Sequence, residues 1–501
     1  MNRIIRHITL VIVFNTILTV IHGQVYLSPG SQLTIKNGTS LYIGTDLTLK
    51  STSTSSGYLV DQTMSNNVTI TGNILVERYL SPDDWHNISA PLSNATHSQF
   101  TGTDLVFSYN ESLVMNDWNF GWVWHTGALS TMKGYDVFVP LSAVTVQYTS
   151  SNPSDLHSGS FTTGVTITNV ADGETPDHKG WNLIGNPYPS PIDWLIESAW
   201  NKTAINDAKY IWDPVGEIYT IFIGGGSPVG LNGGTQFVPS NQGFWVQAVQ
   251  NGTISVNNAS RIGLTASTPD YYKEVSIDYP LLKIQVAGND FKDETIIRFI
   301  EGATDGFDRN LDALKLFTAS EKVPQLYSKS KVNDLAINTL DRIYDGLVIP
   351  LFMTAHKSGI YALSVCNESH WNQENKIYLN DVDLGTFTNV DEGFSYSFYT
   401  EAFEAENRFK IIFNPSEEQL NTEKANYEVY TTKSSINIHP ISTQSQEVNL
   451  NIYNMLGQIV STFQTPISKS FSYNPALPSG NYILEIVNGN QSSKFKINLM
   501  L

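Results

Sequence analysis

The chain contains a single cysteine, Cys366, among 501 residues, so an intrachain disulfide is excluded. Domains that fold without disulfides need large cores, which suits two to four domains of roughly 100–200 residues each. Cys366 directly follows the apolar run of residues 361–365, which has the pattern of a strand. We therefore expect a buried structural thiol rather than a reactive nucleophile.

Positive charge is scarce. The chain has 29 basic and 47 acidic residues, a formal net charge of −18, and no basic cluster. Nucleic acids and anionic membranes bind positively charged surfaces, so neither is an expected partner. Long apolar runs are missing as well. After residue 21, no stretch reaches the roughly 18 apolar residues of a membrane-spanning helix, so no transmembrane segment is expected.

The common catalytic and cofactor motifs are also missing. The chain has no His-Glu-x-x-His metal motif, no Gly-x-Ser-x-Gly turn and no phosphate-binding loop ending in Gly-Lys-Ser/Thr. We therefore expect neither an enzyme nor a bound cofactor. One alternative stays open, because the two carboxylates of a glycoside hydrolase meet only in the folded chain and leave no motif.

The N-terminus has the pattern of a signal peptide. Arg3 and Arg6 precede a mainly apolar stretch, residues 8–21, that is too short to span a membrane. We assign residues 1–23 to a signal peptide. Residues 24–80 contain short strand-like pieces separated by Gly, Ser and Asn, which favours a few turns of β-solenoid or a sandwich edge. These pieces are residues 33–35, 41–43, 47–49, 68–70 and 74–76.

Residues 81–265 contain a faint internal duplication. The segment Trp85-His-Asn-Ile-Ser-Ala-Pro91 parallels Trp181-Asn-Leu-Ile-Gly-Asn-Pro187. Later in each copy, Lys133-Gly-Tyr-Asp-Val-Phe-Val139 parallels Gln242-Gly-Phe-Trp-Val-Gln-Ala248. Such repetition predicts two equivalent supersecondary blocks that pack against each other.

Residues 266–415 have the pattern of a β-sandwich, with strand-like runs separated by turn signals. The runs are residues 281–286, 294–299, 347–351, 361–365, 376–379 and 408–413. Residues 416–426 are polar and rich in turn formers, so we interpret them as a linker to a last domain, residues 427–501.

Tryptophan is concentrated in the duplicated region, where nine of the ten lie between Trp85 and Trp245. Flat aromatic rings stack on sugars, but they also fill sandwich cores, where each buries about 150–250 Å². Both interpretations stay open. Trp122 and Trp124 share one face if their segment is extended, and together with Trp118 they are the candidate ligand-binding residues.

A loop with several oxygen-bearing side chains is a candidate calcium site. Its residues are Asp305, Asp308, Asn310 and Asp312. Calcium takes six to eight oxygen ligands, of which such a loop supplies several, but the spacing does not match an EF-hand. A solvated turn stabilised by its own Asp and Asn side chains is the alternative.

Residues 427–501 have the pattern of a small all-β module. Residues 448–453 alternate between apolar and polar side chains, as in a half-buried strand. Turns follow at residues 454–457 and 478–481, and Asn488-Gly489 is a typical hairpin turn. The return strand, residues 494–499, alternates again, which completes a compact β-sandwich.

Two segments of this module, Asn451-Ile-Tyr-Asn-Met-Leu-Gly-Gln-Ile-Val460 and Leu477-Pro-Ser-Gly-Asn-Tyr-Ile-Leu484, resemble the type A C-terminal sorting domain of Bacteroidetes type IX secretion cargo. The resemblance implies Sec-dependent passage into the periplasm and then recognition by the type IX machinery. It also implies removal of the sorting domain, with the mature chain released or fixed to surface lipopolysaccharide. The residues expected to shape the sorting signal are Gly457, Gly480, Tyr482 and Leu484.

Residues 180–194 resemble a recurrent segment of uncharacterised Bacteroidetes surface proteins. The sequence therefore predicts an exported, all-β protein with several sandwich-like domains in tandem, located at the cell surface or outside the cell. For the mature region we expect adhesion or glycan binding. The alternatives are a secreted polysaccharide-degrading enzyme with an unmarked carboxylate pair and a purely structural surface protein.

Overall fold

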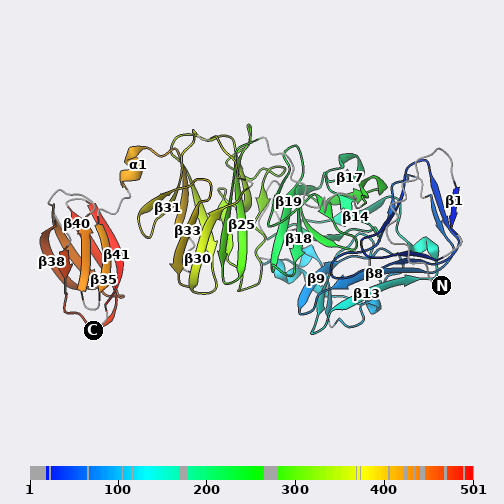
Figure 1. Ribbon diagram of the computed structural model, residues 1–501, viewed down its shortest axis with the longest axis horizontal. Helices are drawn as coiled ribbons and strands as arrows, with labels where there is room; N and C mark the ends of the chain where they lie inside the picture. Colours follow the sequence, from blue (N-terminus) through cyan, green and yellow to red (C-terminus); the bar gives the residue numbers. More distant parts are fainter. Residues whose placement is uncertain are drawn as a thin grey trace. The chain divides into compact units, whose positions relative to one another are not determined.

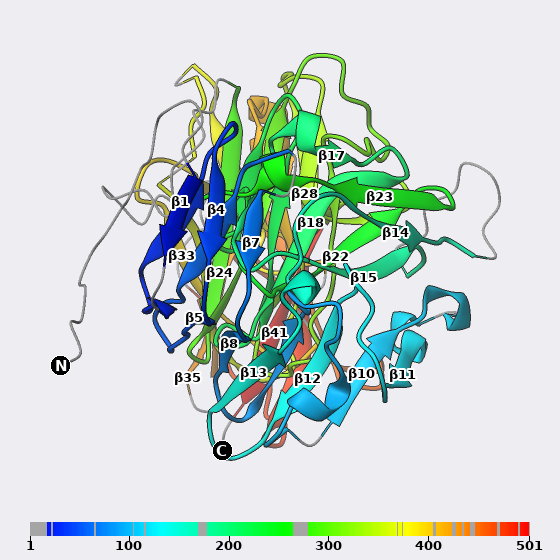
Figure 2. The same ribbon diagram turned by 90° about the vertical axis from the view of Figure 1, so that its right-hand side faces the viewer.

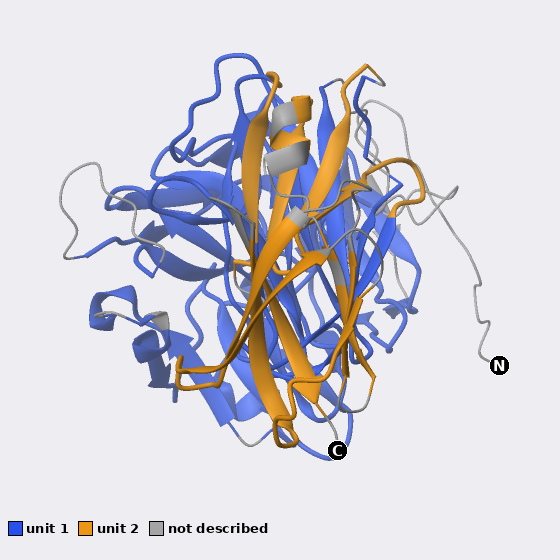
Figure 3. Ribbon diagram, turned by 90° about the vertical axis from the view of Figure 1, so that its left-hand side faces the viewer, with its two compact units in different colours: residues 1–342, 352–372, 395–406 blue, residues 343–351, 373–394, 407–501 orange. Residues whose placement is uncertain are grey.

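The structure is a computed structural model, and nearly all of its regular elements are β-strands. It describes residues 18–21, 24–64, 67–103, 105–114, 117–168, 178–263, 279–367, 369–372, 374–403, 407–422, 427–432, 435–440, 446–467, 471–488 and 491–499. The expected all-β fold is confirmed, because the one α-helix in these ranges is α1 (Glu417–Thr422). The chain forms two compact units, coloured separately in Figure 3. Unit 1 comprises residues 1–342, 352–372 and 395–406, and unit 2 comprises residues 343–351, 373–394 and 407–501.

The N-terminal part of unit 1 is a short β-solenoid with three faces, as expected. Each strand pairs in parallel with the strand three positions further along the chain. The first face holds β1 (Leu18–Ile21), β4 (Ser40–Ile43) and β7 (Val68–Ile70), which lie side by side in Figure 2. The second face holds β2 (Val25–Leu27), β5 (Leu47–Leu49) and β8 (Ile74–Leu80), and the third holds β3 (Gln32–Ile35) and β6 (Tyr58–Asp61).

The solenoid is held together by apolar side chains that point inward from its short strands. Ile43, Leu47, Leu49 and Leu59 are at most 1% exposed and belong to one core cluster. Most of the predicted signal peptide lies outside the described residues, but its last apolar residues form β1 in the uncleaved chain. Cleavage of the peptide stays a prediction.

The predicted duplication has a structural counterpart in unit 1. In the first copy, β9 (Asp84–Ile88) pairs antiparallel with β12 (Tyr135–Val139), and Ile88 lies opposite Tyr135. In the second copy, β15 (Trp181–Gly185) pairs antiparallel with β22 (Gly243–Ala248), and Ile184 lies opposite Phe244. These are equivalent positions in the two copies, so the pairing register is repeated as well as the sequence.

The two copies meet at a local pseudo-two-fold axis. An isolated antiparallel bridge joins Ile88 to Gln242, and its counterpart joins Lys133 to Ile184. Matching hydrogen bonds connect the Ser89 N–H to the Asn241 carbonyl and the Gly185 N–H to the Met132 carbonyl, both at 3.1 Å. Met132 and Asn241 also share a positive φ, at 60° and 57°. The copies therefore contact each other through equivalent residues.

Each copy extends into its own sheet. The first sheet has the order β11-β10-β12-β9 and the second has the order β15-β22-β18-β19-β20. The added strands are β10 (Leu105–Tyr109), β11 (Trp122–Trp124), β18 (Ile205–Asp213), β19 (Ile218–Ile223) and β20 (Val229–Leu231). β13 (Val144–Ser150) pairs with β8 and extends the sheet of the second solenoid face. Smaller sheets pair β23 (Gly252–Val256) with β14 (Phe161–Val165) and β17 (Trp200–Asn201), and β16 (Ile192–Asp193) with β21 (Phe237–Val238). Short 3-10 helices lie at η1 (His97–Gln99), η2 (Glu111–Leu113), η3 (Trp118–Gly121), η4 (Pro153–Asp155), η5 (Glu197–Ala199) and η6 (Asn258–Ser260).

A further sheet of unit 1 packs against the second copy. Its strands follow the order β27-β28-β25-β24-β30-β33, and β26 also pairs with β28. Their bounds are β24 (Leu281–Gly288), β25 (Phe291–Phe299), β26 (Ala313–Leu314), β27 (Gln325–Lys329), β28 (Asp334–Leu340), β30 (Gly359–Val365) and β33 (Ser395–Thr400). Trp181 and Trp245 share one core cluster with Leu281, Ile296 and Leu335. The predicted boundary between residues 265 and 266 lies within unit 1, and the domain division stays a prediction.

Unit 2 contains the sheet segment β32-β31-β34-β29, up to residue 351 of β29, and the C-terminal module, four of whose strands (β35, β38, β40 and β41) are labelled in Figure 1. The strands of the sheet are β29 (Leu347–Thr354), β31 (Ile377–Asp381), β32 (Thr386–Asn389) and β34 (Phe409–Phe413). The module has two sheets, β35-β36-β39 and β38-β37-β40-β41, which share one core cluster. Its strands are β35 (Tyr427–Thr432), β36 (Ser435–Pro440), β37 (Gln446–Tyr453), β38 (Ile459–Ile467), β39 (Phe471–Tyr473), β40 (Gly480–Asn488) and β41 (Gln491–Leu499). The expected small β-sandwich is confirmed.

Two local features were not expected from the sequence. The predicted linker, residues 416–426, contains helix α1, because Ser416 and Gln419 form a reciprocal capping box. Cys366 is partly exposed rather than buried, since it follows the last residue of β30 and lies at the end of the strand. Its backbone N–H still donates to the Lys283 carbonyl at 3.0 Å.

Arg261 connects the solenoid to the second copy and is 1% exposed. Its guanidinium donates to the Leu59 carbonyl at 2.6 Å and to the Ser190 hydroxyl at 3.0 Å. It also stacks on the Tyr188 ring, 4.9 Å from the centroid. Burial lowers the pKa of Arg261 to about 10, which records the cost of enclosing its charge.

We expect Arg261→Met to lower the free energy of unfolding by about 3 kcal/mol, because buried oxygen acceptors lose their donors. The measurement is the urea midpoint of unfolding. Arg342→Met is the matched control, since the Arg342 side chain is 82% exposed and pairs with Asp341 at the surface. Equal midpoints for the two variants would contradict this role of Arg261.

Candidate ligand-binding site

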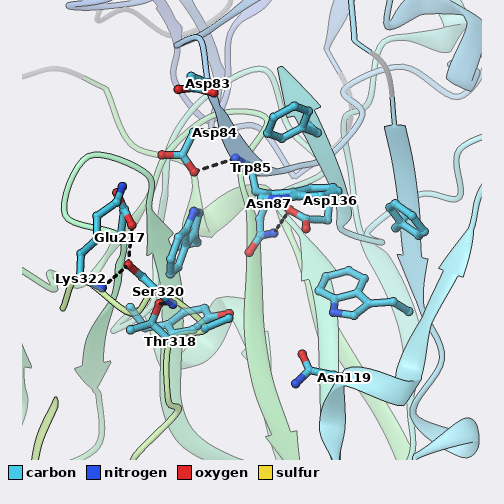
Figure 4. A pocket seen from close by; sticks show the side chains of 16 residues that line it. Asp83, Asp84, Trp85, Asn87, Asn119, Asp136, Glu217, Thr318, Ser320 and Lys322 are labelled. Atoms are coloured by element: carbon cyan, nitrogen blue, oxygen red, sulfur yellow. Dashed lines mark hydrogen bonds and ion pairs between the residues drawn. The ribbon is translucent and has the colours of Figure 1, made fainter. Parts of the chain in front are cut away.

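Unit 1 contains a cavity of about 480 Å³ beside the first copy of the duplication (Figure 4). Its walls come from three parts of the chain: the sheet of the first copy, the β18–β19 hairpin and residues 318–322. Six aromatic residues line it: Trp85, Phe107, Trp122, Phe138, Trp212 and Tyr219. Its polar lining is formed by Asp83, Asp84, Asn87, Asn119, Asp136, Glu217, Thr318, Ser320 and Lys322.

Strand alternation explains why the first copy presents a polar and aromatic face to the cavity. Successive side chains of a strand point to opposite faces of its sheet. On β12, Tyr135, Val137 and Val139 are at most 2% exposed and enter the core shared with the solenoid. The residues between them, Asp136 and Phe138, line the cavity and are only partly buried. Their partners in the register of β9 and β12 are cavity residues too.

The aromatic rings form two groups on the cavity wall. The Trp85 ring packs between Phe107 and Phe138, with centroid distances of 5.8 and 5.2 Å. Trp212 and Tyr219 lie 5.1 Å apart on the β18–β19 hairpin in an edge-on arrangement. Trp85, Phe107, Phe138 and Trp212 are all partly exposed, so ring surface remains for a ligand.

Two residues in strained backbone conformations bring carboxylates to the cavity. Asp83 has φ 61° and Glu217 has φ 49°, a region that non-glycine residues adopt at an energetic cost. The Asp83 N–H donates to the Val139 carbonyl at 2.8 Å, which fixes the turn before β9. Glu217 accepts hydrogen bonds from the Ser320 hydroxyl and the Lys322 ammonium, both at 2.5 Å.

The carboxyl groups of the cavity differ in their protonation behaviour. Burial raises the pKa of Asp84 to about 6, and the nearby charge of Glu217 adds to the effect. Burial raises the pKa of Asp136 to about 7, although the Asn87 amide donates to it at 2.7 Å. Burial alone would raise the pKa of Glu217, but the hydrogen bonds from Lys322 and Ser320 outweigh it and lower that pKa. Near pH 7 the cavity therefore contains both ionised and protonated carboxyl groups.

The indole N–H of Trp212 is shielded from solvent and, in the part of the chain described here, meets no hydrogen-bond acceptor in good geometry. It lies close enough to the Asp84 carboxylate to lower the pKa of that group slightly. A buried donor without an acceptor is costly, so the site favours a ligand or water that accepts from it.

The structure separates the three candidate tryptophans. Trp122 and Trp124 lie on one face of β11, opposite Tyr109 and Phe107 of β10. Trp122 lines the cavity and packs edge-on against Tyr109 at 5.3 Å. Trp124 is 55% exposed and packs against Phe107 outside the cavity lining. Trp118 begins η3, and its ring lies outside the described part of the structure.

The two copies of the duplication differ at two positions that line the cavity in the first copy. Asn87 and Asp136 of the first copy correspond to Leu183 and Trp245 of the second. In the second copy both side chains are at most 2% exposed and fill the core against the neighbouring sheet. The first copy has polar groups at the equivalent positions, where the sheet faces the cavity. The sequence analysis missed these two positions, which a residue-by-residue comparison of the two copies could have found.

In the candidate calcium loop, the carboxylates of Asp308 and Asp312 accept hydrogen bonds from backbone N–H groups. The Asp312 carboxylate is fully buried and accepts from the Asp308 and Thr339 N–H groups, both at 2.7 Å. The Asp308 carboxylate accepts from the Thr304 N–H at 2.6 Å, while Asp305 and Asn310 are exposed. Among the described residues, no group of three or more His, Cys, Asp or Glu side chains is placed to hold a metal ion. The arrangement favours the turn, and calcium binding stays an untested prediction.

The four residues expected to shape the sorting signal have structural roles in the C-terminal module. Gly457 has φ 79° in the turn between β37 and β38, and Gly480 begins β40. The Tyr482 hydroxyl donates to the Pro478 carbonyl at 3.0 Å. Leu484 is fully buried in the module's core. Contact of these residues with the export machinery stays a prediction.

Comparison with known proteins gives two family matches. The model described as Domain of unknown function (DUF8693) matches residues 3–413, and the model described as Secretion system C-terminal sorting domain matches residues 414–499. The second match confirms that the chain carries a type IX sorting domain. In the described part of the chain, no helix has the length and apolar character needed to cross a membrane.

Two individual proteins are also similar to this chain. The minor fimbrium subunit Mfa5 of Porphyromonas gingivalis is 22% identical over 405 residues, which cover 74% of this chain and 31% of that protein. This chain therefore spans less than a third of that relative. A solved structure titled "Biofilm associated protein - BSP domain" is 9% identical and covers 68% of this chain and 81% of its own, with a TM-score of 0.13.

Proposed function

We propose a function for this chain, which belongs to the Domain of unknown function (DUF8693) family and ends in a secretion-system sorting domain. It binds glycans through the cavity of unit 1. The sorting domain makes the chain a cargo of type IX secretion, either secreted or attached to the cell surface. Binding without turnover, and adhesion as its consequence, are the parts that we propose.

The observation that carries the proposal is the aromatic and carboxylate lining of the cavity. The cavity of about 480 Å³ falls within the ~300–1,000 Å³ of typical small-ligand sites. The partly exposed faces of Trp85 and Trp212 suit the C–H surfaces of a sugar ring. Asn87, Asp136 and Glu217 supply acceptors and donors for hydroxyl groups. The similarity to a minor fimbrium subunit supports an adhesive role at the surface.

The test is binding of the exported protein, purified from its native host, to a glycan array. We expect at least one glycan to bind with a dissociation constant in the micromolar range. The same preparation is then incubated with the bound glycan and the products are separated by chromatography. We expect the glycan to be recovered intact. The absence of any binding across the array would contradict the proposal.

A second candidate, a polysaccharide-degrading enzyme, is favoured by one observation. The raised pKa values of Asp84 and Asp136 and the lowered pKa of Glu217 provide an acid and an ionised carboxylate in one cavity. Release of shorter sugars in the incubation, and its loss in Glu217→Gln, would establish this candidate. If neither binding nor turnover is found, the purely structural surface role is the remaining candidate.

A further inference from the structure

We propose that the sugar held in this cavity carries a free primary amine, so that its ligand is a hexosamine unit with an ammonium group. The inference rests on the proposed function and deepens it by naming the class of ligand. It follows from the balance of charge in the cavity, from one carboxylate oxygen that no described residue satisfies, and from the aromatic rings beside it.

The cavity has more negative than positive groups. Asp83, Asp84, Asp136 and Glu217 line it, and Lys322 is the single basic residue in the described part of its lining. Lys322 is already paired with Glu217 at 2.5 Å. Among the described residues, no ion pair reaches the other three carboxylates. Figure 4 shows the Glu217–Lys322 pair on one side of the site and Asp136 on the other. A cationic ligand would balance this charge.

Asp136 lines the cavity, and among the described residues one of its carboxylate oxygens is paired and the other is open. Its Oδ1 accepts from the Asn87 amide at 2.7 Å, and no described group donates to its Oδ2. Asn87 is itself held by the Trp245 indole, which donates to its Oδ1 at 3.1 Å. The open oxygen is therefore presented by a fixed arrangement of side chains. An ammonium group is the strongest donor that a sugar can offer to a carboxylate.

Aromatic rings surround this carboxylate on the same face of the sheet. Phe107 lies opposite Asp136 in the pairing of β10 with β12, and Trp85 lies opposite Phe138 in the pairing of β12 with β9. The face of an aromatic ring attracts a cation within about 6 Å of its centroid, most strongly at tryptophan. A carboxylate beside aromatic faces is a suitable environment for an ammonium group, and a neutral sugar would gain only the stacking.

The remaining lining favours a sugar amine over a lysine side chain of a protein. Asn119, Thr318 and Ser320 surround the cavity with further hydrogen-bonding groups, beyond what one ammonium group needs. A sugar ring has hydroxyl groups around its ammonium, whereas a lysine has an apolar stem. The cavity therefore matches a compact, polar cation with C–H faces.

The proposal predicts a definite pH dependence. The groups facing Asp84 and Asp136 are the carboxylates of Asp83 and Glu217, the Lys322 ammonium and the Tyr219 hydroxyl. Both aspartates are mostly protonated at pH 5 and more ionised at pH 7, since their pKa values are raised to about 6 and about 7. A bound ammonium stabilises the ionised forms. Its affinity should therefore rise between pH 5 and pH 7, as long as the amine itself stays protonated.

The experiment compares two probes by titration calorimetry on the exported protein, purified from its native host. One probe is a set of glucosamine and galactosamine oligosaccharides with free amines, and the other is the same set after complete N-acetylation. We expect the free amines to bind about tenfold or more tightly than the N-acetylated set at pH 7. This preference should shrink at pH 5, by about tenfold for each unit by which the bound ammonium lowers the pKa of an aspartate. The variants are Asp136→Asn, which keeps the shape of the side chain, and Asp290→Asn as the control.

Asp136→Asn should weaken binding of the amine by about tenfold at pH 7 and leave the N-acetylated form nearly unchanged. Asp290→Asn removes one acidic charge of unit 1 at an exposed turn with φ 69°, where Asn is well tolerated, and should have no effect. Equal affinities for the two probes would overturn the inference and leave glycan binding intact. Binding of trilysine but of neither sugar set would overturn it in favour of a protein ligand. Failure of all probes, with an empty glycan array, would overturn both proposals.

Discussion

Replacing Leu484 by Asp is expected to abolish export, so that the full-length chain accumulates in the periplasm and falls to background in the medium and on the cell surface. Leu484 is fully buried on β40, in the single core that joins the two sheets of the sorting domain. Truncating a buried leucine costs about 2–5 kcal/mol, and a buried, unpaired carboxylate costs more. A small domain with one core cannot absorb that loss.

Immunoblots of the medium, the cell surface and the periplasm measure this effect in the native host. Leu484→Met is the matched control, because a volume-conserving replacement costs less than about 1.5 kcal/mol and should leave export nearly normal. If the Asp variant were exported as well as the Met variant, the folded sorting domain would not be the export signal.

Trp85→Ala is expected to weaken glycan binding by at least about thirtyfold, equivalent to the roughly 2 kcal/mol lost when a central aromatic contact is removed. Trp85 lines the cavity between Phe107 and Phe138, and its partly exposed ring offers a stacking surface on the sheet that carries Asp136. The measurement is titration of each purified variant with the glycan that the array identifies.

Trp124→Ala is the control for this experiment, because Trp124 lies on the same face of the first sheet but outside the cavity. It should keep the wild-type affinity. Thermal unfolding of both variants separates lost binding from lost folding. If Trp85→Ala unfolds at the wild-type temperature and binds the glycan with normal affinity, the cavity is not the glycan-binding site.

The regular parts of the fold were predictable from local sequence patterns. The alternation of residues 448–453 corresponds to part of β37, and the short runs at residues 47–49 and 68–70 coincide with β5 and β7. In sequence, all three strands alternate apolar with polar residues or form short runs between turn residues, so their pattern is local. The β6 strand was missed, since Tyr58–Asp61 is a continuous run with no alternation.

The cavity was not predictable in the same way. Its walls combine residues 83–138, 212–219 and 318–322, which are far apart in the chain and meet only through the packing of three sheets. The tryptophans pointed to the right region, but their spacing did not distinguish Trp122 in the lining from Trp124 outside it. The better signal was a polar residue in a strand whose repeat is apolar, as at Asp136 and Trp245.

Helix α1 shows the opposite error, in which a local signal was present and was not used. Ser416 followed three residues later by Gln419 is the pattern of a capping box, and the structure contains both of its hydrogen bonds. The abundance of polar residues and turn formers in this segment suggested a linker, and that role stays a prediction. Composition therefore gave the location of the connection, and the capping residues determined its conformation.

The most direct test of the account is a crystal structure of the secreted chain with the glycan that it binds. We predict electron density for a sugar ring stacked against Trp85, with a donor group of the sugar within hydrogen-bond distance of the Asp136 carboxylate. Density for the sugar at another place, such as the exposed face of Trp124, with the cavity filled only by water, would contradict it.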